Sequence, residues 1–415
     1  MLKSYPGKLE EKRIALWACH HKTFFMNWLP ITLAAASAAF ILSFAPGPSL
    51  IKNKQATGRV APKIQAAILL DVSNSMDGLI DQAKNQLWNM VNVLSKVTCD
   101  GTMPSIEIAL YEYGRPQNNS TDGFVKQISP FTKDLDLLFK ELISLQTNGG
   151  DEFCGHVIYN SLTQLNWDSS ASSYKVIFIA GNESFLQGDI SFTKACEEAR
   201  KKGVVVNTIY CGNKDQGVKE NWNLGAECGN GSFSNIDQNA QPLLIPTPYD
   251  TTIITLKDKL NETYIVYGRK GRLYYESMLH ADTLPIYNIV DPTKADSFVL
   301  SQSFIVRSNK NLYSNPQWDL VDAIETNPGI IDTLDMTTLD DSLKTRSRKE
   351  LRKVVETTTA QRKKIQDQIA ELALKQEKFI KAEKEKQKAN EPQTLESEIE
   401  RIIREQVKRV NMKIE

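Results

Sequence analysis

The stretch KIQAAILLDVSNS, residues 63–75, decides how the rest of the sequence is interpreted. Its first part, Lys63–Asp71, is an apolar run that ends on an acidic residue. Such a run is typical of a β-strand buried on both faces, as in parallel sheets that are covered by helices. These sheets bind ligands at the carboxyl ends of their strands. Asp71, Ser73 and Ser75 are therefore expected at the ligand-binding edge.

Segments with strand and helix patterns alternate along the sequence that follows. Helical spacing is expected for residues 77–97, 134–145, 153–165 and 191–202. Strands are expected for residues 105–114, 123–130, 174–181, 203–211 and 231–237. Buried strands that alternate with helices predict an α/β, Rossmann-like domain whose mostly parallel central sheet is flanked by helices.

The polar residues at the end of the first strand have the chemistry of a cation site. Asp71, Ser73 and Ser75 offer one carboxylate and two hydroxyls from a single short turn. Oxygen ligands in a compact loop suit a small hard cation that keeps several waters, so we expect Mg²⁺ ahead of Ca²⁺ or Mn²⁺.

The segment Asp71-Val72-Ser73-Asn74-Ser75 resembles the DxSxS motif of the von Willebrand factor type A superfamily, whose site is called the metal-ion-dependent adhesion site. The likeness covers roughly residues 62–268. The phrases IFIAGNESF, VVVNTIYCG and GSFSNID resemble a bacterial subgroup that is secreted or membrane-anchored. The resemblance implies a divalent cation that accepts a further carboxylate from a protein partner.

The superfamily adds a threonine from a second loop and an aspartate from a later strand, and this sequence departs from both. Asp151 stands after two glycines where relatives carry the threonine, and Asn182 stands where the aspartate is usual. The resemblance therefore predicts a metal set of Asp71, Ser73, Ser75, Asp151 and Asn182. Asp151 is expected to contribute more than Glu152. In the alternative interpretation the site holds no metal and Asp71 only caps the following turn.

Residues 149–153 spell GGDEF, the hallmark string of diguanylate cyclases. A cyclase requires a strand on each side of the string, whereas residues 153–165 have helical spacing. His156 has no nucleophilic partner nearby in the sequence, and no phosphate-binding or nucleophile-elbow motif occurs. A metal-dependent enzyme of the cyclase type is therefore the alternative to a binding module without enzymatic activity.

Composition excludes few functions. The 415 residues include 50 Lys and Arg and 50 Asp and Glu, so net charge gives no argument for nucleic-acid binding. The six cysteines form no CxxC pair. Buried thiols are one interpretation of the five that fall within the domain, and one disulfide in an oxidising compartment is the other.

The N-terminal part contains a run long enough to cross a membrane. Residues 24–44 carry no charge over 21 positions, and five basic residues precede them. An uncleaved anchor and a signal segment that starts at Met26 both stay open. Either places the rest of the chain outside the cytoplasm, secreted or membrane-anchored in the cell envelope. The predicted organisation is a basic segment 1–23, a membrane or signal segment 24–45, a linker 46–62 and the domain 63–245.

Two further regions follow, 246–340 and a charged helical tail 341–415. Residues 251–268 are expected to form a helix that packs on the domain, and residues 269–340 show no motif. A weak heptad seam, broken by Thr358, Arg362 and Gln376, comprises Leu351, Val355, Ile365, Ile369, Leu372 and Phe379. A helix break is expected at Pro392. The last helix, from Thr394, has an apolar face that either packs on its own chain or binds a partner or a second copy.

Taken together, these patterns predict a metal-dependent binding or scaffold module of the cell envelope, which engages a protein partner through an acidic side chain of that partner. The N-terminal segment would add the contact with the membrane.

Overall fold

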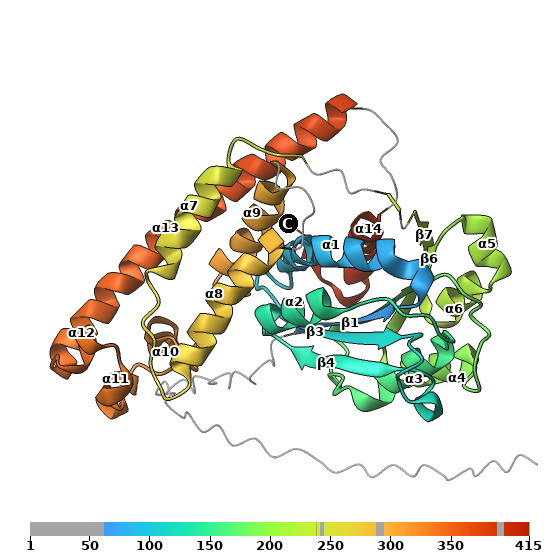
Figure 1. Cartoon of the computed structure of the whole chain (residues 1–415), viewed down its shortest axis with the longest axis horizontal. Helices are drawn as coiled ribbons and strands as arrows, with labels where there is room; N and C mark the ends of the chain where they lie inside the picture. The colour runs from blue at the N-terminus through green and yellow to red at the C-terminus, as the bar shows by residue number, and fades with distance from the viewer. Residues whose placement is uncertain (1–61, 238, 241–244, 288–293, 388–393, 415) are drawn as a thin grey trace, which may run out of the picture. The chain divides into compact units, whose positions relative to one another are not determined.

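A six-stranded sheet with helices on both faces carries the candidate site (Figure 1). The computed structural model describes residues 62–237, 239–240, 245–287, 294–387 and 394–414, which lie within one compact unit, residues 59–415. The strands of the sheet are β1 (Lys63–Asp71), β3 (Ser105–Tyr113), β4 (Lys126–Thr132), β5 (Tyr174–Gly181), β6 (Val205–Cys211) and β7 (Asn230–Ile236). The helices between them are α1 (Asp77–Ser95), α2 (Leu135–Ser144), α3 (Cys154–Gln164), α4 (Phe192–Lys202), α5 (Lys214–Lys219) and α6 (Trp222–Cys228).

The strand order β4-β3-β1-β5-β6-β7 places β1 near the middle of the sheet. β1 pairs in parallel with β3 and with β5, while β4 runs antiparallel to β3. Because β1 and β5 have neighbours on both sides and helices on both faces, nearly all of their residues are buried. The predicted α/β fold with a mostly parallel sheet is confirmed.

Polar side chains set several of the helix boundaries. The carboxylate of Asp134 accepts a hydrogen bond from the Leu137 N–H at 3.0 Å, and the Ser191 hydroxyl accepts one from Lys194 N–H at 3.3 Å. Both residues are N-caps that satisfy free amides of the first helical turn. α4 ends at Gly203, whose φ of 64° suits glycine. The sequence does not predict the short helices α5 and α6, because neither is long enough to show apolar residues repeating at helical spacing.

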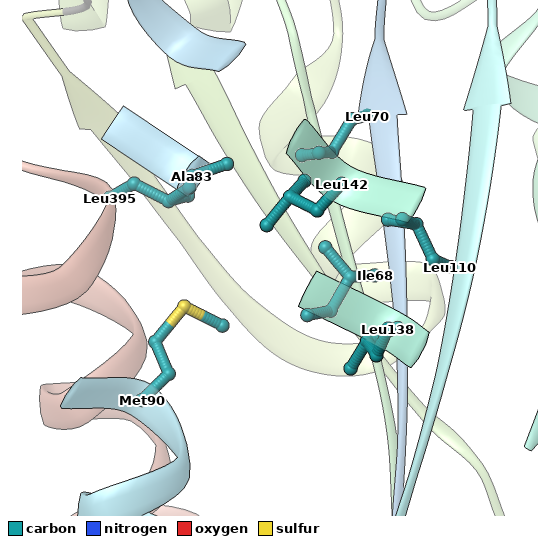
Figure 2. A pocket seen from close by; sticks show the side chains of 8 residues that line it. All are labelled: Ile68, Leu70, Ala83, Met90, Leu110, Leu138, Leu142 and Leu395. Carbon is teal, nitrogen blue, oxygen red and sulfur yellow. The ribbon is translucent and has the colours of Figure 1, made fainter. Parts of the chain in front are cut away.

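Two apolar cores lie against the opposite faces of the sheet. One is shared with α3, α4 and α6, and the other with α1, α2 and the last helix, α14 (Leu395–Gln406). The apolar face of α14 is therefore buried against its own chain, and Gln406 at its end donates to Asn207 Oδ1 of β6 at 2.6 Å. Figure 2 shows Leu395 of α14 lining a small apolar cavity with side chains of β1, α1 and α2. The packing alternative for the last helix is confirmed.

The region between the sheet and the last helix is helical. It contains α7 (Asp250–Asn261), α8 (Gly271–Tyr287), α9 (Lys294–Ser308), α10 (Leu320–Thr326), α11 (Ile330–Thr333), α12 (Asp341–Lys344) and α13 (Arg348–Gln387). Short 3₁₀ turns span Asn74–Met76, Ser120–Asp122, Met336–Thr338 and Val407–Val410, and β2 (Val97–Thr98) pairs with β8 (Lys413–Ile414).

The helix expected over residues 251–268 ends at Asn261, which corrects the prediction. The chain beyond it is extended, because Tyr267 N–H donates to Trp318 O at 2.9 Å and Leu320 N–H donates to Ile265 O at 2.8 Å. α7 packs mainly on α9 and α13 rather than on the sheet.

The heptad seam of α13 packs on helices of its own chain. Leu351 and Val355 join a core with residues of α10 and α11, and Ile365 and Ile369 join one with α7 and α9. The residue Arg362, which breaks the seam, is buried and donates to Asp319 Oδ2 at 2.6 Å and to Asp322 Oδ1 at 2.9 Å. The seam is therefore interrupted where polar groups tie the helices together.

A buried ion cluster joins this helical region to the sheet. Arg307 of α9 donates from Nε to Asp136 Oδ1 of α2 at 2.9 Å, and its guanidinium also pairs with Asp282 of α8. The guanidinium lies 4.9 Å from the centre of the Trp88 ring. The Arg307 side chain is only 5% exposed, so these contacts hold a buried cation and join α9 to α1, α2 and α8.

Cys196 of α4 and Cys228 of α6 form a disulfide, while Cys99, Cys154 and Cys211 are free thiols. Of the two interpretations of the cysteines, the structure has the disulfide.

In the described part of the chain, no helix is both long and apolar enough to cross a membrane. The run at residues 24–44, Cys19 and the break expected at Pro392 lie outside the described residues.

Replacing Arg362 by methionine is expected to lower the free energy of unfolding by about 3–5 kcal/mol, because it leaves the fully buried Asp319 carboxylate without its partner. The matched control is Lys363→Met at the exposed neighbouring position, which is expected to change it by less than about 0.5 kcal/mol. Urea denaturation followed by circular dichroism measures both. Equal effects of the two substitutions would contradict the role given to Arg362.

Candidate metal centre

The candidate centre lies at the carboxyl edge of the sheet, where β1 ends at Asp71. Val72 continues the pairing with β3 by donating to Tyr113 O at 3.0 Å, and the chain then turns into α1. Met76, at the start of α1, is fully buried and anchors the turn in the core. The apolar strand, the turn and the buried anchor hold the polar side chains between them at the edge.

Asp71 is fully buried, and its two carboxylate oxygens differ in their surroundings. Oδ1 accepts a hydrogen bond from the Ser73 N–H at 2.8 Å. Among the described residues, Oδ2 has no hydrogen-bond partner of normal geometry. A buried carboxylate oxygen without a partner is costly, so its environment needs a positive group or a proton.

Two glycines allow their neighbours to pack closely beside this carboxylate. A Cβ atom on Gly114 would lie 3.0 Å from Asp71 Oδ1, and one on Gly181 would lie 3.0 Å from Oδ2. Gly114 has a φ of +87°, which glycine adopts without strain. Side chains at either position would crowd the oxygens that the predicted cation needs.

Three of the other predicted residues come together around Asp71. The hydroxyls of Ser73 and Ser75 lie 3.3 Å apart. Asn182, directly after β5, donates from Nδ2 to Ser75 Oγ at 3.1 Å. The edges of β1 and β5 are adjacent because the strands pair in parallel, which is why residues more than 100 positions apart in sequence meet here.

The loop of residues 149–153 brings Glu152 inward in place of the predicted Asp151. Asp151 is exposed, whereas Glu152 is buried and its carboxylate is hydrogen-bonded by the Ser73 side chain. The loop passes so close to β3 that a Cβ on Gly150 would lie 2.5 Å from Gly114 O. This contact sets which residue faces the site, and no sequence pattern signals it. Burial therefore favours Glu152 over the predicted Asp151 as the inward residue, and their order in metal binding stays a prediction.

Burial and neighbouring charge raise the proton affinity of both inward carboxylates. Burial raises the pKa of Asp71 to about 7, and the charge of Glu183 adds to the shift. Burial, followed by the charge of Asp71, raises the pKa of Glu152 to about 8. Negative charges that are held close together without water favour a bound cation, since a cation lowers the cost of ionising each of them.

The donor set fits a hard divalent cation. It consists of carboxylate, hydroxyl and amide oxygens, the ligands that Mg²⁺ and Ca²⁺ prefer. Within the described residues, no group of three or more His, Cys, Asp and Glu side chains is arranged to hold a metal. The fit therefore depends on Ser73, Ser75 and Asn182 as well as on the carboxylates.

The GGDEF string at residues 149–153 lies between α2 and α3, and α3 begins directly after it at Cys154. No strand flanks the string within the segment 135–164, which the structure describes in full. The string is consequently not the turn of a β-hairpin, which is the arrangement expected of a cyclase.

The fold and the site define an α/β domain with a cluster of oxygen-bearing side chains, the candidate cation site, at the carboxyl end of its first strand. Residues 63–236 form a mostly parallel sheet of the order β4-β3-β1-β5-β6-β7, with Asp71, Ser73 and Ser75 at the carboxyl end of its first strand. No protein-family model matches the sequence, and no curated protein sequence matches it.

Several solved structures are similar to part of the chain. Proximal thread matrix protein 1 from the mussel byssus, with a zinc-occupied metal-ion-dependent adhesion site, is 14% identical over 42% of each chain, with a TM-score of 0.32. The Rpn10 VWA domain is 15% identical over 44% of this chain and 91% of its own, with a TM-score of 0.32.

An aerotolerance-related membrane protein from Bacteroides fragilis is 15% identical over 42% of this chain and 93% of its own, with a TM-score of 0.29. The match with the mussel protein spans less than half of that protein's length. At these identities and TM-scores the likenesses carry no argument about function.

The substitution Asp71→Asn tests whether the pKa of Asp71 is raised. The measurement is made in EDTA, so that no metal is bound. Because the folded pKa, about 7, lies above the ordinary value of 3.8, burial of the neutral carboxyl contributes stability below about pH 4 that is lost as pH rises to about 7. Relative to Asp71→Asn, the wild-type free energy of unfolding should fall by about 4 kcal/mol over this range. Urea denaturation at several pH values measures this difference, and parallel curves for the two proteins would contradict it.

A pair of neighbouring substitutions tests the loop register. Glu152→Gln is expected to weaken Mg²⁺ binding at least about tenfold, since it removes a buried charge beside Asp71 and Ser73. Asp151→Asn, at the exposed neighbouring position, is the control and should change the affinity less than about twofold. Titration calorimetry measures both, and the reverse order would support the register predicted from the sequence.

Proposed function

We propose that the protein is a non-enzymatic binding module of the cell envelope, which engages a protein partner through a divalent cation held by Asp71, Ser73 and Ser75. The single observation that carries the proposal is the buried Asp71 oxygen that lacks a hydrogen-bond partner among the described residues and lies at the ligand-binding edge of the sheet. A cation at this position would give that oxygen the positive partner that its burial requires.

Glu152 and Asn182 complete the protein's part of the proposed site. Glu152 supplies a second, buried carboxylate whose pKa is raised by burial and by the charge of Asp71. Asn182 supplies an amide oxygen from the adjacent strand end. We propose Mg²⁺ ahead of Ca²⁺ or Mn²⁺, and an acidic side chain of the partner as the ligand that arrives from outside.

Ser75 and Asn182 form the outer side of the site. Ser75 is exposed, and Asn182 is partly exposed, so an incoming carboxylate reaches this side without any displacement of the core. Asp71, by contrast, is out of reach of solvent. The buried carboxylates therefore hold the cation, and the outer side is left for water or for the partner.

The location in the cell envelope is part of the proposal. The disulfide between Cys196 and Cys228 supports it, because such bonds persist mainly in oxidising compartments. The charge-free run at residues 24–44 agrees with it as an anchor or signal.

A scaffold without metal is the second candidate, and one observation favours it. Asn182 Nδ2 donates to Ser75 Oγ, so these two side chains satisfy each other directly. In that case Asp71 would be about half protonated at neutral pH, given a pKa of about 7.

Capture from a cell-envelope extract of the producing organism tests the proposal. Immobilised wild-type protein should retain a partner in millimolar Mg²⁺ and lose it in EDTA, while Asp71→Asn should retain none in either. Capture that is unaffected by EDTA and by the substitution would support the scaffold without metal. Formation of a cyclic dinucleotide from GTP and Mg²⁺ would overturn the binding-module proposal in favour of an enzyme.

A further inference from the structure

The side chain of Tyr113 lies buried beside the Asp71 carboxylate. Tyr113 is the last residue of β3 and the register partner of Asp71 at the end of β1, so the two side chains project to the same face of the sheet. Both residues are fully buried. A polar group at this depth needs a hydrogen-bond partner, and the partner that the Tyr113 hydroxyl takes affects its neighbours.

The Tyr113 side chain reaches across the end of the central strand. The strand order is β3-β1-β5, and Tyr113 Oη of β3 donates a hydrogen bond to Ala180 O of β5 at 3.0 Å. The tyrosine therefore crosses β1 at the end where Asp71 is located. A Cβ on Gly181 would clash with Tyr113 Oη and would lie 3.0 Å from Asp71 Oδ2, so both oxygens lie within 3.0 Å of one point.

Ala180 O and Asp71 Oδ2 are both acceptors close to the Tyr113 hydroxyl. A hydrogen bond to an ionised carboxylate is roughly twice as strong as a bond between neutral groups. The Cys154 thiol, whose sulfur lies 4.0 Å from Tyr113 Oη, is only a weak partner. Burial, followed by the influence of Cys154 and Asp71, raises the pKa of Tyr113 well above its usual value. The hydroxyl therefore keeps its proton and remains a donor.

A cation would decide which of the two acceptors is the better one. A divalent cation at Asp71 Oδ2 would repel the positively polarised hydroxyl hydrogen, so the hydroxyl would bond to Ala180 O, which is the bond that the structure has. Without a cation, an ionised Oδ2 is a buried charge that needs a donor. The Tyr113 hydroxyl can supply that donor after a small movement, because both oxygens already lie beside Gly181.

We propose that Tyr113 is a positioning residue of the candidate centre, whose hydroxyl donates to Asp71 Oδ2 when the cation is absent and to Ala180 O when the cation is bound. This inference rests on the proposed function, in which a cation binds Asp71. Because the cation has to displace the hydroxyl from Oδ2, Tyr113 lowers the affinity of the site for metal. The exchange of a charge-assisted hydrogen bond for a neutral one corresponds to about threefold to tenfold in affinity.

The substitution Tyr113→Phe tests this inference on the full chain, because it removes the hydroxyl and keeps the ring. Titration calorimetry with Mg²⁺ at pH 8, above the pKa of Asp71, should give an affinity about threefold to tenfold higher than that of the wild type. The matched control is Tyr111→Phe. Tyr111 is also fully buried on β3, but its hydroxyl donates to Gln164 Oε1 at 3.2 Å, so its loss should leave the affinity for Mg²⁺ unchanged.

Carbon-13 NMR of the wild-type protein, labelled at tyrosine Cζ, follows the hydroxyl itself and does not depend on how well a variant folds. The chemical shift of Cζ responds to the hydrogen bond that the hydroxyl makes. After assignment, the Tyr113 resonance should move when Mg²⁺ replaces EDTA, whereas the Tyr111 resonance should stay in place.

Two kinds of result would contradict this account, and they differ in what they leave standing. Mg²⁺ binding that is lost in Asp71→Asn but is unchanged or weakened in Tyr113→Phe, or a Tyr113 resonance that does not respond to Mg²⁺, would overturn the inference and leave the cation site in place. No Mg²⁺ binding by the wild type, or binding that Asp71→Asn does not affect, would overturn the proposed function and this inference with it.

Discussion

The burial of the Asp71 carboxylate at the end of the central strand is the constraint on which the arrangement of the site depends. A charge in this position is costly, because the carboxylate is fully buried and its Oδ2 oxygen has no hydrogen-bond partner of normal geometry among the described residues. Gly114 and Gly181 pack closely beside its two oxygens, and the Ser73 and Ser75 hydroxyls lie at the same edge. A cation bound beside Asp71 Oδ2 would explain these features together, because it would be the partner that this oxygen lacks.

The scaffold around this carboxylate is assembled from distant parts of the sequence. α14, which lies more than 300 residues after β1, supplies part of the core on one face of the sheet and ends in a hydrogen bond to β6. Arg307 ties α9 to α2 through a buried ion cluster. The helical region is thus joined to the sheet through buried contacts, and the edge that carries the site lies on a fixed support.

The sequence predicts the strands well, because burial on both faces leaves an apolar run that ends where the chain meets solvent. β1 and β5 have the predicted bounds, and Asp134 and Ser191, the predicted first residues of two helices, act as caps. The inward position of Glu152 was not predictable, because it depends on how closely Gly150 passes the backbone of Gly114. The heptad pattern of α13 could not show whether its seam meets another copy or helices of the same chain, since both need the same apolar spacing.

The position of a bound metal tests the central claim most directly. Crystals of the protein soaked in Mn²⁺ can be examined for anomalous scattering from the metal. The account predicts a peak within coordination distance of Asp71 Oδ2 and the hydroxyls of Ser73 and Ser75, with Glu152 rather than Asp151 beside it, and no peak in Asp71→Asn. A wild-type map with no peak at this position, and with Asn182 still bonded to Ser75, would contradict it.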